Sequence, residues 1–154
     1  MTLIFAALVI GLVAGSRTLL APAAVSLAAI SGWIDLSLSP LAFLGMTPSA
    51  VVFAGLALAE LVADTLPWVP SRKTVGPFLC RIVSGGLCGA ALGSLGGALL
   101  AGLIAGVTGA AGGTLAGYAA RMRMAAACGR DLPAALIEDG AAVALAVVAI
   151  TLAS

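Results

Sequence analysis

Residues 3–30 read LIFAALVIGLVAGSRTLLAPAAVSLAAI, an apolar stretch whose single charged residue is Arg17. A helix that crosses a bilayer needs about 20 residues, so this stretch is long enough to be a membrane span. Gly15-Ser16-Arg17-Thr18 and Pro22 interrupt it, which predicts either a tilted, kinked helix or a helix broken near Arg17. Because irregular backbone at membrane depth is tolerated only against protein or a water-filled cavity, we expect this segment inside a helix bundle.

The composition of the whole chain supports a membrane protein. Of 154 residues, 62% are hydrophobic and 8% are charged, and the mean hydropathy is +1.24. Soluble domains carry about 25% charged residues, so water cannot be the solvent for this surface. We expect an all-α, polytopic transmembrane helix bundle that forms a single integral membrane domain over residues 1–154, with the first span retained rather than cleaved as a signal peptide.

Charge and residue type exclude several function classes. The net charge is +1, so the chain has no broad basic face for nucleic acid, and we expect none as a partner. Histidine is absent, which removes the commonest metal ligand and the usual pH switch near neutrality. The lipid bilayer remains the expected surrounding of the chain.

The apolar segments predict about five spans. The region 75–120 is too long for one helix, and we place its division at 93–97 rather than at the alternative turn 108–114. The segments 35–46, 67–73 and 121–132 read as a short connector, an interfacial loop and a basic loop. The expected spans are 3–30, 48–66, 75 to about 93, about 97–120 and 133–152.

Lysine and arginine predict the orientation of these spans. The two basic groups follow the second and fourth expected spans, and five spans place both groups on one side of the membrane. Because cytoplasmic loops are enriched in Lys and Arg, that side is the cytoplasm. The N-terminus is then cytoplasmic and the C-terminus lies outside. The groups are Arg72, Lys73 and Arg81, and Arg121, Arg123 and Arg130.

Glycines recur every four residues over the third and fourth expected spans. Such spacing puts small residues on one helix face, where two backbones can approach closely. This face can pack within the chain, form a joint between subunits, or line a groove for a ligand. Because five spans make a thin bundle, we expect a homo-oligomer. The glycines are Gly85, Gly89, Gly93, Gly97, Gly109, Gly113 and Gly117.

Four carboxylates lie inside apolar segments, and they are the strongest indication of function. Glu60 and Asp64 are four apart on one helical face, and Glu138 and Asp139 begin the last span. At a rise of 1.5 Å per residue, Glu60 lies roughly 9 Å inside its helix end and Glu138 roughly 7–8 Å inside its own. We expect the four acids to converge near the inner leaflet, because an ionisable group in a bilayer is costly and is usually functional.

Three arrangements would allow such acids to coexist. Some can hold and exchange a proton, or they can bind a cation such as Mg²⁺, Ca²⁺ or Mn²⁺ through Glu60, Asp64, Glu138 and Asp139. Alternatively they form ion pairs with arginines, of which Arg17, Arg81 and Arg121 are candidates. A broken helix at Arg17 would also offer backbone N–H groups beside a positive charge, which suits an anion or a lipid headgroup. No other cofactor is expected.

Three short motifs resemble a family of small bacterial integral membrane proteins known as domain of unknown function 4126. The first is Gly11-Leu12-Val13-Ala14-Gly15-Ser16-Arg17 with Pro22, and the second runs from Glu60 through Asp64 to Pro67. The third is the pair Glu138-Asp139. Thr65 stands where the family pattern favours Lys. The resemblance implies a membrane location and a role for these acids, and it says nothing about a substrate.

We therefore expect a transporter or channel-like protein for an ion or small solute, with Arg17 and the four acids as its site. The alternative is a structural or assembly protein that packs against a membrane-protein partner. An enzyme is not expected, because no Ser or Cys has an evident base beside it. The remaining enzymatic hypothesis, an aspartyl dyad of Asp64 and Asp139, has no supporting sequence around either residue.

Overall fold

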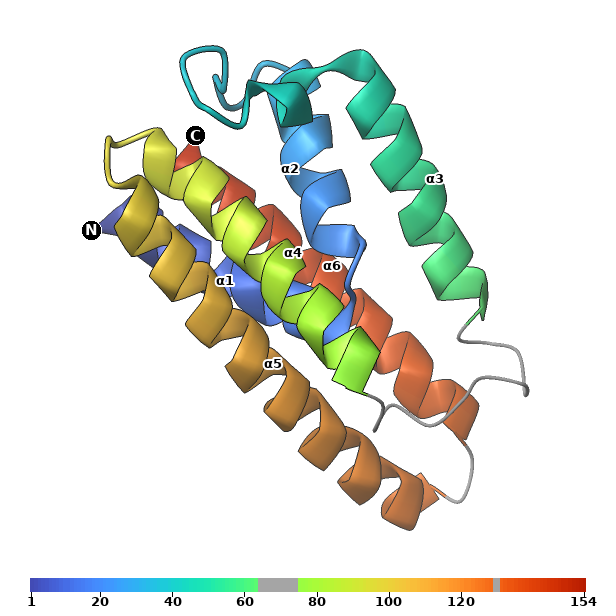
Figure 1. Cartoon of the computed structure of the whole chain (residues 1–154). Coiled ribbons are helices and arrows are strands. Elements are labelled where there is room, and N and C mark those ends of the chain that lie inside the picture. The colour runs from blue at the N-terminus through green and yellow to red at the C-terminus, as the bar shows by residue number, and fades with distance from the viewer. Residues whose placement is uncertain (64–74, 129–130) are drawn as a thin grey trace.

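The computed structural model describes residues 1–63, 75–128 and 131–154, without the side chains at 63, 75, 120–128, 131–136 and 138 (Figure 1). This part of the chain is all-helical, as expected, and contains no strand. Successive α-helices run alternately toward the two ends of the molecule. The helices are α1 (Thr2–Ser16), α2 (Leu20–Ile30), the 3-10 helix η1 (Ala42–Gly45), α3 (Thr47–Ala63), α4 (Val75–Ser94), α5 (Leu99–Cys128) and α6 (Asp131–Ala153).

The first expected span is broken at Arg17, and the two pieces form a hairpin. Arg17 has extended backbone angles, φ −133° and ψ 110°, which end α1 after Ser16. Helix α2 starts three residues later and runs back toward the end of the molecule where α1 began (Figure 1). Pro22 lies in the first turn of α2, where its missing N–H removes no helical hydrogen bond. The break expected near Arg17 is thus confirmed.

Helix α1 lies at the centre of a tightly packed group that also contains α4, α5 and α6. Its buried residues include Ile10, Val13 and Ala14, each of which has 0% of its surface accessible. Glycine allows the backbones to touch: at Gly11 and Gly15 of α1 an added Cβ would collide with the α5 backbone. These close approaches hold α1 in place and thereby fix where its C-terminal end, and the break, lies.

The glycine face of α4 packs against α5 within the same chain. A Cβ on Gly89 would lie 2.7 Å from the Cα of Gly106, and one on Gly93 would lie 2.7 Å from the Cα of Gly102. Gly109 and Gly113 of α5 face α1 in the same manner. At these glycines the backbone of a neighbouring helix in the same chain already occupies the space, which corresponds to the first of the three expected uses of the glycine face.

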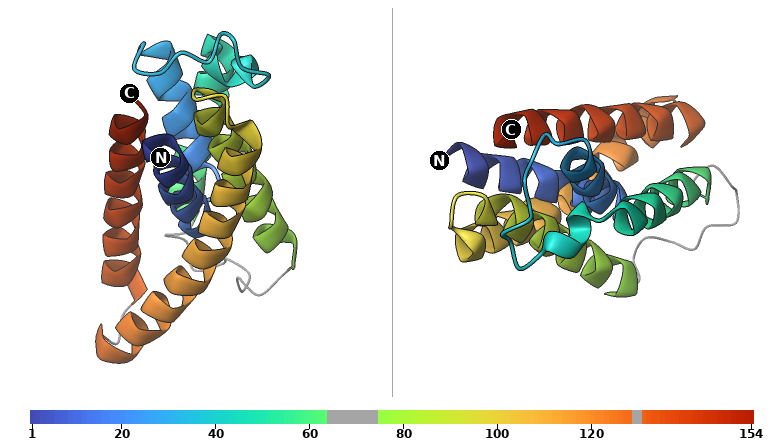
Figure 2. Two further views of the ribbon diagram at one scale, coloured as in Figure 1. Left: turned by 90° about the vertical axis from the view of Figure 1, so that its left-hand side faces the viewer. Right: turned by 90° about the horizontal axis from the view of Figure 1, so that it is seen from above.

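Helices α2 and α3, with η1 between them, form an arm beside this group. Helix α3 packs mainly on α2 and η1, and Figure 2 shows it at the periphery of the molecule. Its surface is largely exposed and apolar, with Val51 and Leu58 more than 60% accessible. The connection from α2 to η1 is bonded to α4 through the hydroxyls of Ser39 and Ser94, 2.8 Å apart.

The element boundaries confirm one expectation and correct another. The turn between α4 and α5 covers residues 95–98, where the expected division lay, and Gly97 has the positive φ of 69° that favours glycine there. The alternative turn at 108–114 lies inside α5. The basic loop expected at 121–132 is wrong, because α5 continues to Cys128 and α6 begins at Asp131. Arginine is a good helix former, so two arginines did not justify ending the helix.

Two helices of the described chain are long and apolar enough to cross a membrane, Gly76–Ser94 and Leu99–Ala119. Four shorter apolar helices cover Thr2–Ser16, Leu20–Ile30, Thr47–Val62 and Asp139–Ala153. Five spans are therefore not confirmed. Because the chain reverses its direction between α1 and α2, both termini lie at the same end of the molecule (Figures 1 and 2).

Candidate functional site at the break between α1 and α2

A helix break inside an apolar bundle exposes backbone groups that need hydrogen-bond partners. Helix α1 ends with unbonded carbonyls, and α2 begins with unbonded N–H groups. At the end of α1, the Val13 carbonyl accepts bonds from the Arg17 amide at 2.8 Å and from the Ser16 hydroxyl at 2.9 Å. The other polar groups of the break obtain partners from helices that lie far away in the sequence.

Glu60 of α3 caps the start of α2. Its Oε1 accepts the Thr18 amide at 2.9 Å, and its Oε2 accepts the Leu19 amide at 2.8 Å. A carboxylate is favourable at a helix N-terminus because the aligned peptide dipoles leave partial positive charge there. Both oxygens of one side chain are therefore engaged by two successive backbone donors, and α3 is joined to α2 at the break.

Arg17 and Asp139 form an ion pair across the same break. The Arg17 side chain is 1% exposed and that of Asp139 is 16% exposed. Nε of Arg17 donates to Oδ1 of Asp139 at 2.7 Å, and a terminal guanidinium nitrogen donates to the same oxygen. Because α1 and α6 run in opposite directions, the end of α1 meets the early turns of α6. The break thus allows Arg17 to form an ion pair with an acid, which is one of the three arrangements that the sequence allowed for the buried acids.

Two hydroxyl side chains that the sequence did not point to complete the site. Ser84 of α4 donates to the Thr18 carbonyl at 2.6 Å, and Thr114 of α5 donates to the Gly15 carbonyl at 3.1 Å. A serine or threonine in a membrane helix can bond its own preceding turn, as Thr114 also does with Ala110. The sequence therefore does not show whether a serine or threonine hydroxyl bonds a neighbouring helix or its own helix.

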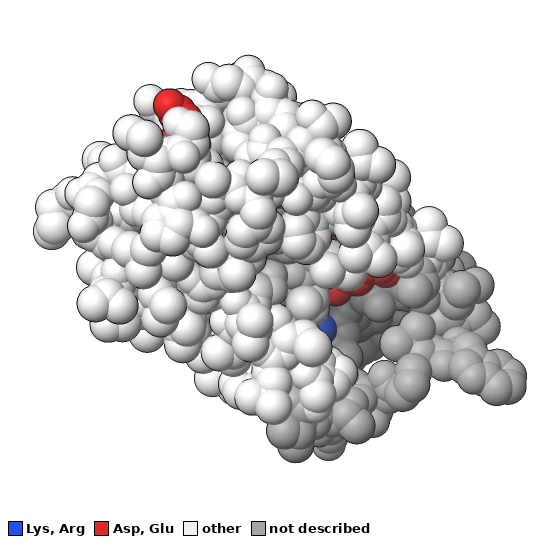
Figure 3. Space-filling model, turned by 45° about the horizontal axis from the view of Figure 1, so that its top comes forward, with Lys and Arg blue, Asp and Glu red and all other residues white. Residues whose placement is uncertain are grey.

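Charged atoms are rare on the face of the molecule that Figure 3 shows, and most of those that it shows gather in one place. Figure 3 shows acidic and basic atoms meeting in a hollow beside residues that the structure does not describe, with a second acidic spot at a distance. The described charged residues near the break are Arg17, Glu60 and Asp139, and Arg81 is buried on α4. The site is therefore a recess whose charges come from helices α1, α3 and α6.

The expected site residues are only partly placed. Arg17, Glu60 and Asp139 come together at the break, where the two acids contact neighbouring backbone and side-chain groups rather than each other. Asp64 and the side chain of Glu138 lie outside the described residues, as do the side chain of Arg121 and the interfacial loop. Among the residues that are described, no group of three acids or cysteines is arranged to hold a metal.

A proton or a small ion that reached this site would have to displace internal contacts. A proton on one Glu60 oxygen would displace the amide that this oxygen accepts, whereas an incoming cation would compete with Arg17 for Asp139. An incoming anion would compete with Asp139 for Arg17, or with Glu60 for the amides of Thr18 and Leu19. Each event would weaken a contact that joins the break to α3 or to α6.

The comparisons with known proteins agree with the motifs at the break. The family model described as Domain of unknown function (DUF4126) matches residues 4–153, which is nearly the whole chain, and the chain belongs to this family. No curated protein and no solved structure matches the chain. This is the family that the motifs of the sequence resemble, and its description assigns no activity.

Proposed function

We propose that this member of a family without an assigned activity is a small multi-pass membrane transporter or channel-like protein for an ion or small solute. The observation that supports the proposal is the break itself. A buried guanidinium and two carboxylates gather at the ends of two short helices inside an apolar bundle. Many transporters place their sites at such discontinuous helices, where helix ends and ionisable residues face the solute.

A membrane arrangement consistent with this site has four crossings and a hairpin. Helices α3 to α6 cross, and the hairpin of α1 and α2 enters from the end that holds both termini. At 1.5 Å per residue, the 15 residues of α1 span about 22 Å, less than the ~30 Å hydrocarbon core. The break would then lie inside the membrane, in the half away from the termini.

The basic residues orient this arrangement. Arg72 and Lys73 fall between α3 and α4 in the sequence, and Arg121 and Arg123 fall in the last turns of α5. These helix ends lie opposite the termini (Figure 1). Because basic residues favour the cytoplasmic side, we place both termini outside the inner membrane of a bacterium, and the break near the cytoplasmic leaflet.

Flux through reconstituted vesicles tests the proposal. Purified protein in liposomes that contain a pH-sensitive dye should dissipate an imposed proton gradient faster than empty liposomes, and radiolabelled rubidium would report cation flux. Glu60→Gln and Asp139→Asn should each reduce the flux roughly tenfold or more, because removing one partner of a buried charged contact costs over 1.4 kcal/mol. Asp35→Asn is the matched control, because Asp35 lies in the connector 35–46 and bonds only locally to the Ser37 amide.

Two results would contradict transport. One is that wild-type vesicles conduct neither protons nor rubidium faster than empty ones. The other is that folded Glu60→Gln and Asp139→Asn proteins both conduct at the wild-type rate. Thermal melting of the purified variants in detergent shows whether they are folded, so that lost flux is not confused with lost structure.

A second function, structural assembly with a membrane-protein partner, is favoured by one observation. Glu60, Asp139, Ser84 and Thr114 all bond within the chain, as groups that only hold a scaffold would. The exposed apolar surface of α3 would then be the contact with a partner or with a second copy. If this function is correct, Val52→Arg in α3 should release a partner that co-purifies from membranes, while proton flux is absent from the wild type.

A further inference from the structure

A groove lies between the arm and the central helices, away from the charged recess. It runs between α2 and α6, has a volume of about 330 Å³, and is open along one side. Apart from the hydroxyl of Ser31 and the indole nitrogen of Trp33, its lining is apolar. The lining residues are Leu20, Ala23, Ala24, Leu27, Ala28, Ser31, Trp33, Val143, Ala146, Val147 and Ile150.

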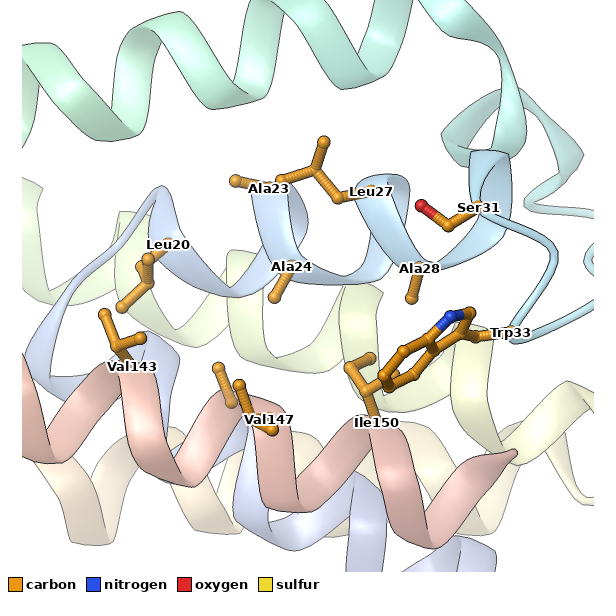
Figure 4. Close-up of a pocket in the computed structure, with 11 residues that line it drawn as sticks. Leu20, Ala23, Ala24, Leu27, Ala28, Ser31, Trp33, Val143, Val147 and Ile150 are labelled. Atoms are coloured by element: carbon orange, nitrogen blue, oxygen red, sulfur yellow. The ribbon is translucent and has the colours of Figure 1, made fainter.

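The side chains of the groove are arranged as two facing rows with one closed end. In Figure 4, Ala24 and Ala28 of α2 point toward Val147 and Ile150 of α6, and the ring of Trp33 lies across one end. Small residues on α2 make the groove deep. Leu27 and Val147 at its rim are 44% and 53% exposed, so the groove is continuous with the outer apolar surface.

We infer that this groove is a binding site for one acyl chain of a bilayer phospholipid. Its length supports this occupant. From Leu20 to Ser31 the groove extends along eleven residue steps of α2, about 16 Å at 1.5 Å per residue. One leaflet of the hydrocarbon core is about 15 Å deep. The groove therefore has the length of a single lipid chain that enters from one face of the membrane.

The polarity of the two ends gives the orientation of the lipid. Ser31 and Trp33 are the hydrogen-bond donors of the lining, and both lie at the end of α2 near the termini. Tryptophan prefers the boundary between hydrocarbon and headgroups, where its ring is apolar and its N–H is wet. The ester and headgroup should therefore lie at Trp33, with the end of the chain near Leu20 and Val143.

The groove suits a hydrocarbon chain better than a second helix. An α-helix with side chains is about 10 Å wide, so it would lie across the open side of the groove rather than inside it. A helix of a second copy could insert only a row of side chains. A straight hydrocarbon chain fits the narrow, uncharged space along its full length. The inference needs the membrane location, but it does not depend on transport.

Photocrosslinking in lipid nanodiscs tests this site. Nanodiscs of phosphatidylethanolamine and phosphatidylglycerol would contain a phosphatidylglycerol with a diazirine at one position of its acyl chain. A diazirine near the ester should label peptides around Trp33 and Ile150, and one at the chain end should label peptides around Leu20 and Val143. Labelled peptides are identified by mass spectrometry.

Two exposed neighbours on α6 provide a matched pair of variants. Val147 lines the groove, whereas Val148 is 46% exposed and lies outside it. Val147→Trp should reduce labelling of α2 and α6 roughly tenfold. This change corresponds to about two methylene groups of the acyl chain that are no longer buried in the groove. Val148→Trp should leave it unchanged. Ala24→Phe in α2 fills the groove from the other side and should have the same effect as Val147→Trp.

Three outcomes would overturn the inference. One is labelling spread evenly over all exposed helices, with no effect of Val147→Trp. Another is a reversed order of labelling, with the chain end near Trp33. The third is that α6 is protected by a second copy, seen as a protein–protein crosslink through Val147 in place of a lipid adduct. Failure of the flux experiment would leave all of these results unaffected.

Discussion

At the scale of single residues, the pair of Arg17 and Asp139 is the strongest constraint on the break. Arg17 is the largest of the fully buried side chains, at 1% exposed, and Asp139 receives two of its N–H groups. Taking both charges out of water is expensive, so the pair itself adds little net stability. Removing one partner is a different matter, because it takes a charged partner away from a group that lies inside the helix bundle.

A double-mutant cycle measures this coupling. Arg17→Gln and Asp139→Asn should each lower the free energy of unfolding in detergent by about 3–5 kcal/mol, the usual cost of removing one partner of a buried ion pair. The double variant should lose clearly less than the sum of the two. Strictly additive losses would mean that the two side chains do not contact each other.

At the scale of helices, backbone contact through glycine replaces side-chain packing. In the central helices, α4 and α1 both lie against α5, and Gly106 serves both contacts. Because lipid is as apolar as any side chain, close backbone packing is the main attraction left between membrane helices. The position of the break depends on this packing, since α1 carries Arg17 at its end.

Substitution of Gly106 separates packing from helix propensity. Alanine is the better helix former by about 1 kcal/mol, so Gly→Ala in an open helix position should be neutral or stabilising. At Gly106 the added methyl would collide with the carbonyl of Gly85 and with the backbone of Gly89. Gly106→Ala should therefore destabilise the fold by about 1–3 kcal/mol, as overpacking does.

The control for this substitution is Gly112→Ala on the same helix. An added Cβ at Gly112 would meet only the side chain of Leu12, at 3.8 Å. Its melting temperature should equal or exceed that of the wild type. Equal melting temperatures for the two alanine variants would show that α5 does not approach α4 and α1 as closely as described.

The sequence predicted these elements unevenly. The break at Arg17 and the turn before α5 could be predicted because Gly, Ser and Pro interrupt apolar runs there. The pairing of glycines could not, because the spacing of four was continued from Gly97 to Gly109 across the turn, and the turn shifts the helical phase. The contacts of α5 with α4 use Gly102 and Gly106 instead. No residue pattern tells how a turn rotates the next helix.

The same limit applies to the candidate site. Buried charge in apolar segments identified Arg17, Glu60 and Asp139, because such residues are costly in a bilayer and rare. Their partners could not be predicted from the sequence. Glu60 bonds two backbone amides, and the residue type at a position does not show whether its backbone amide is such a partner. Ser84 and Thr114 were missed because a hydroxyl can be satisfied within its own helix.

At the scale of the whole molecule, one local feature changes the topology. A kinked first span would carry the chain across the membrane and leave Thr2 and Ser31 on opposite faces. The hairpin of α1 and α2 returns the chain to the end of the molecule where it started. In the membrane arrangement that we propose, the number of crossings, the side of the termini and the depth of the charged recess all follow from this reversal at Arg17–Leu19.

Cysteine labelling from outside the cell tests the hairpin most directly. Thr2→Cys and Ser31→Cys, both at exposed positions, would be made separately in a chain with Cys80, Cys88 and Cys128 replaced by alanine. A membrane-impermeant maleimide is applied to intact spheroplasts, and labelling after permeabilisation gives the total. We expect both cysteines to react before permeabilisation. Reaction of only one of the two would show that residues 2–30 cross the membrane, and would contradict the arrangement of the break described above.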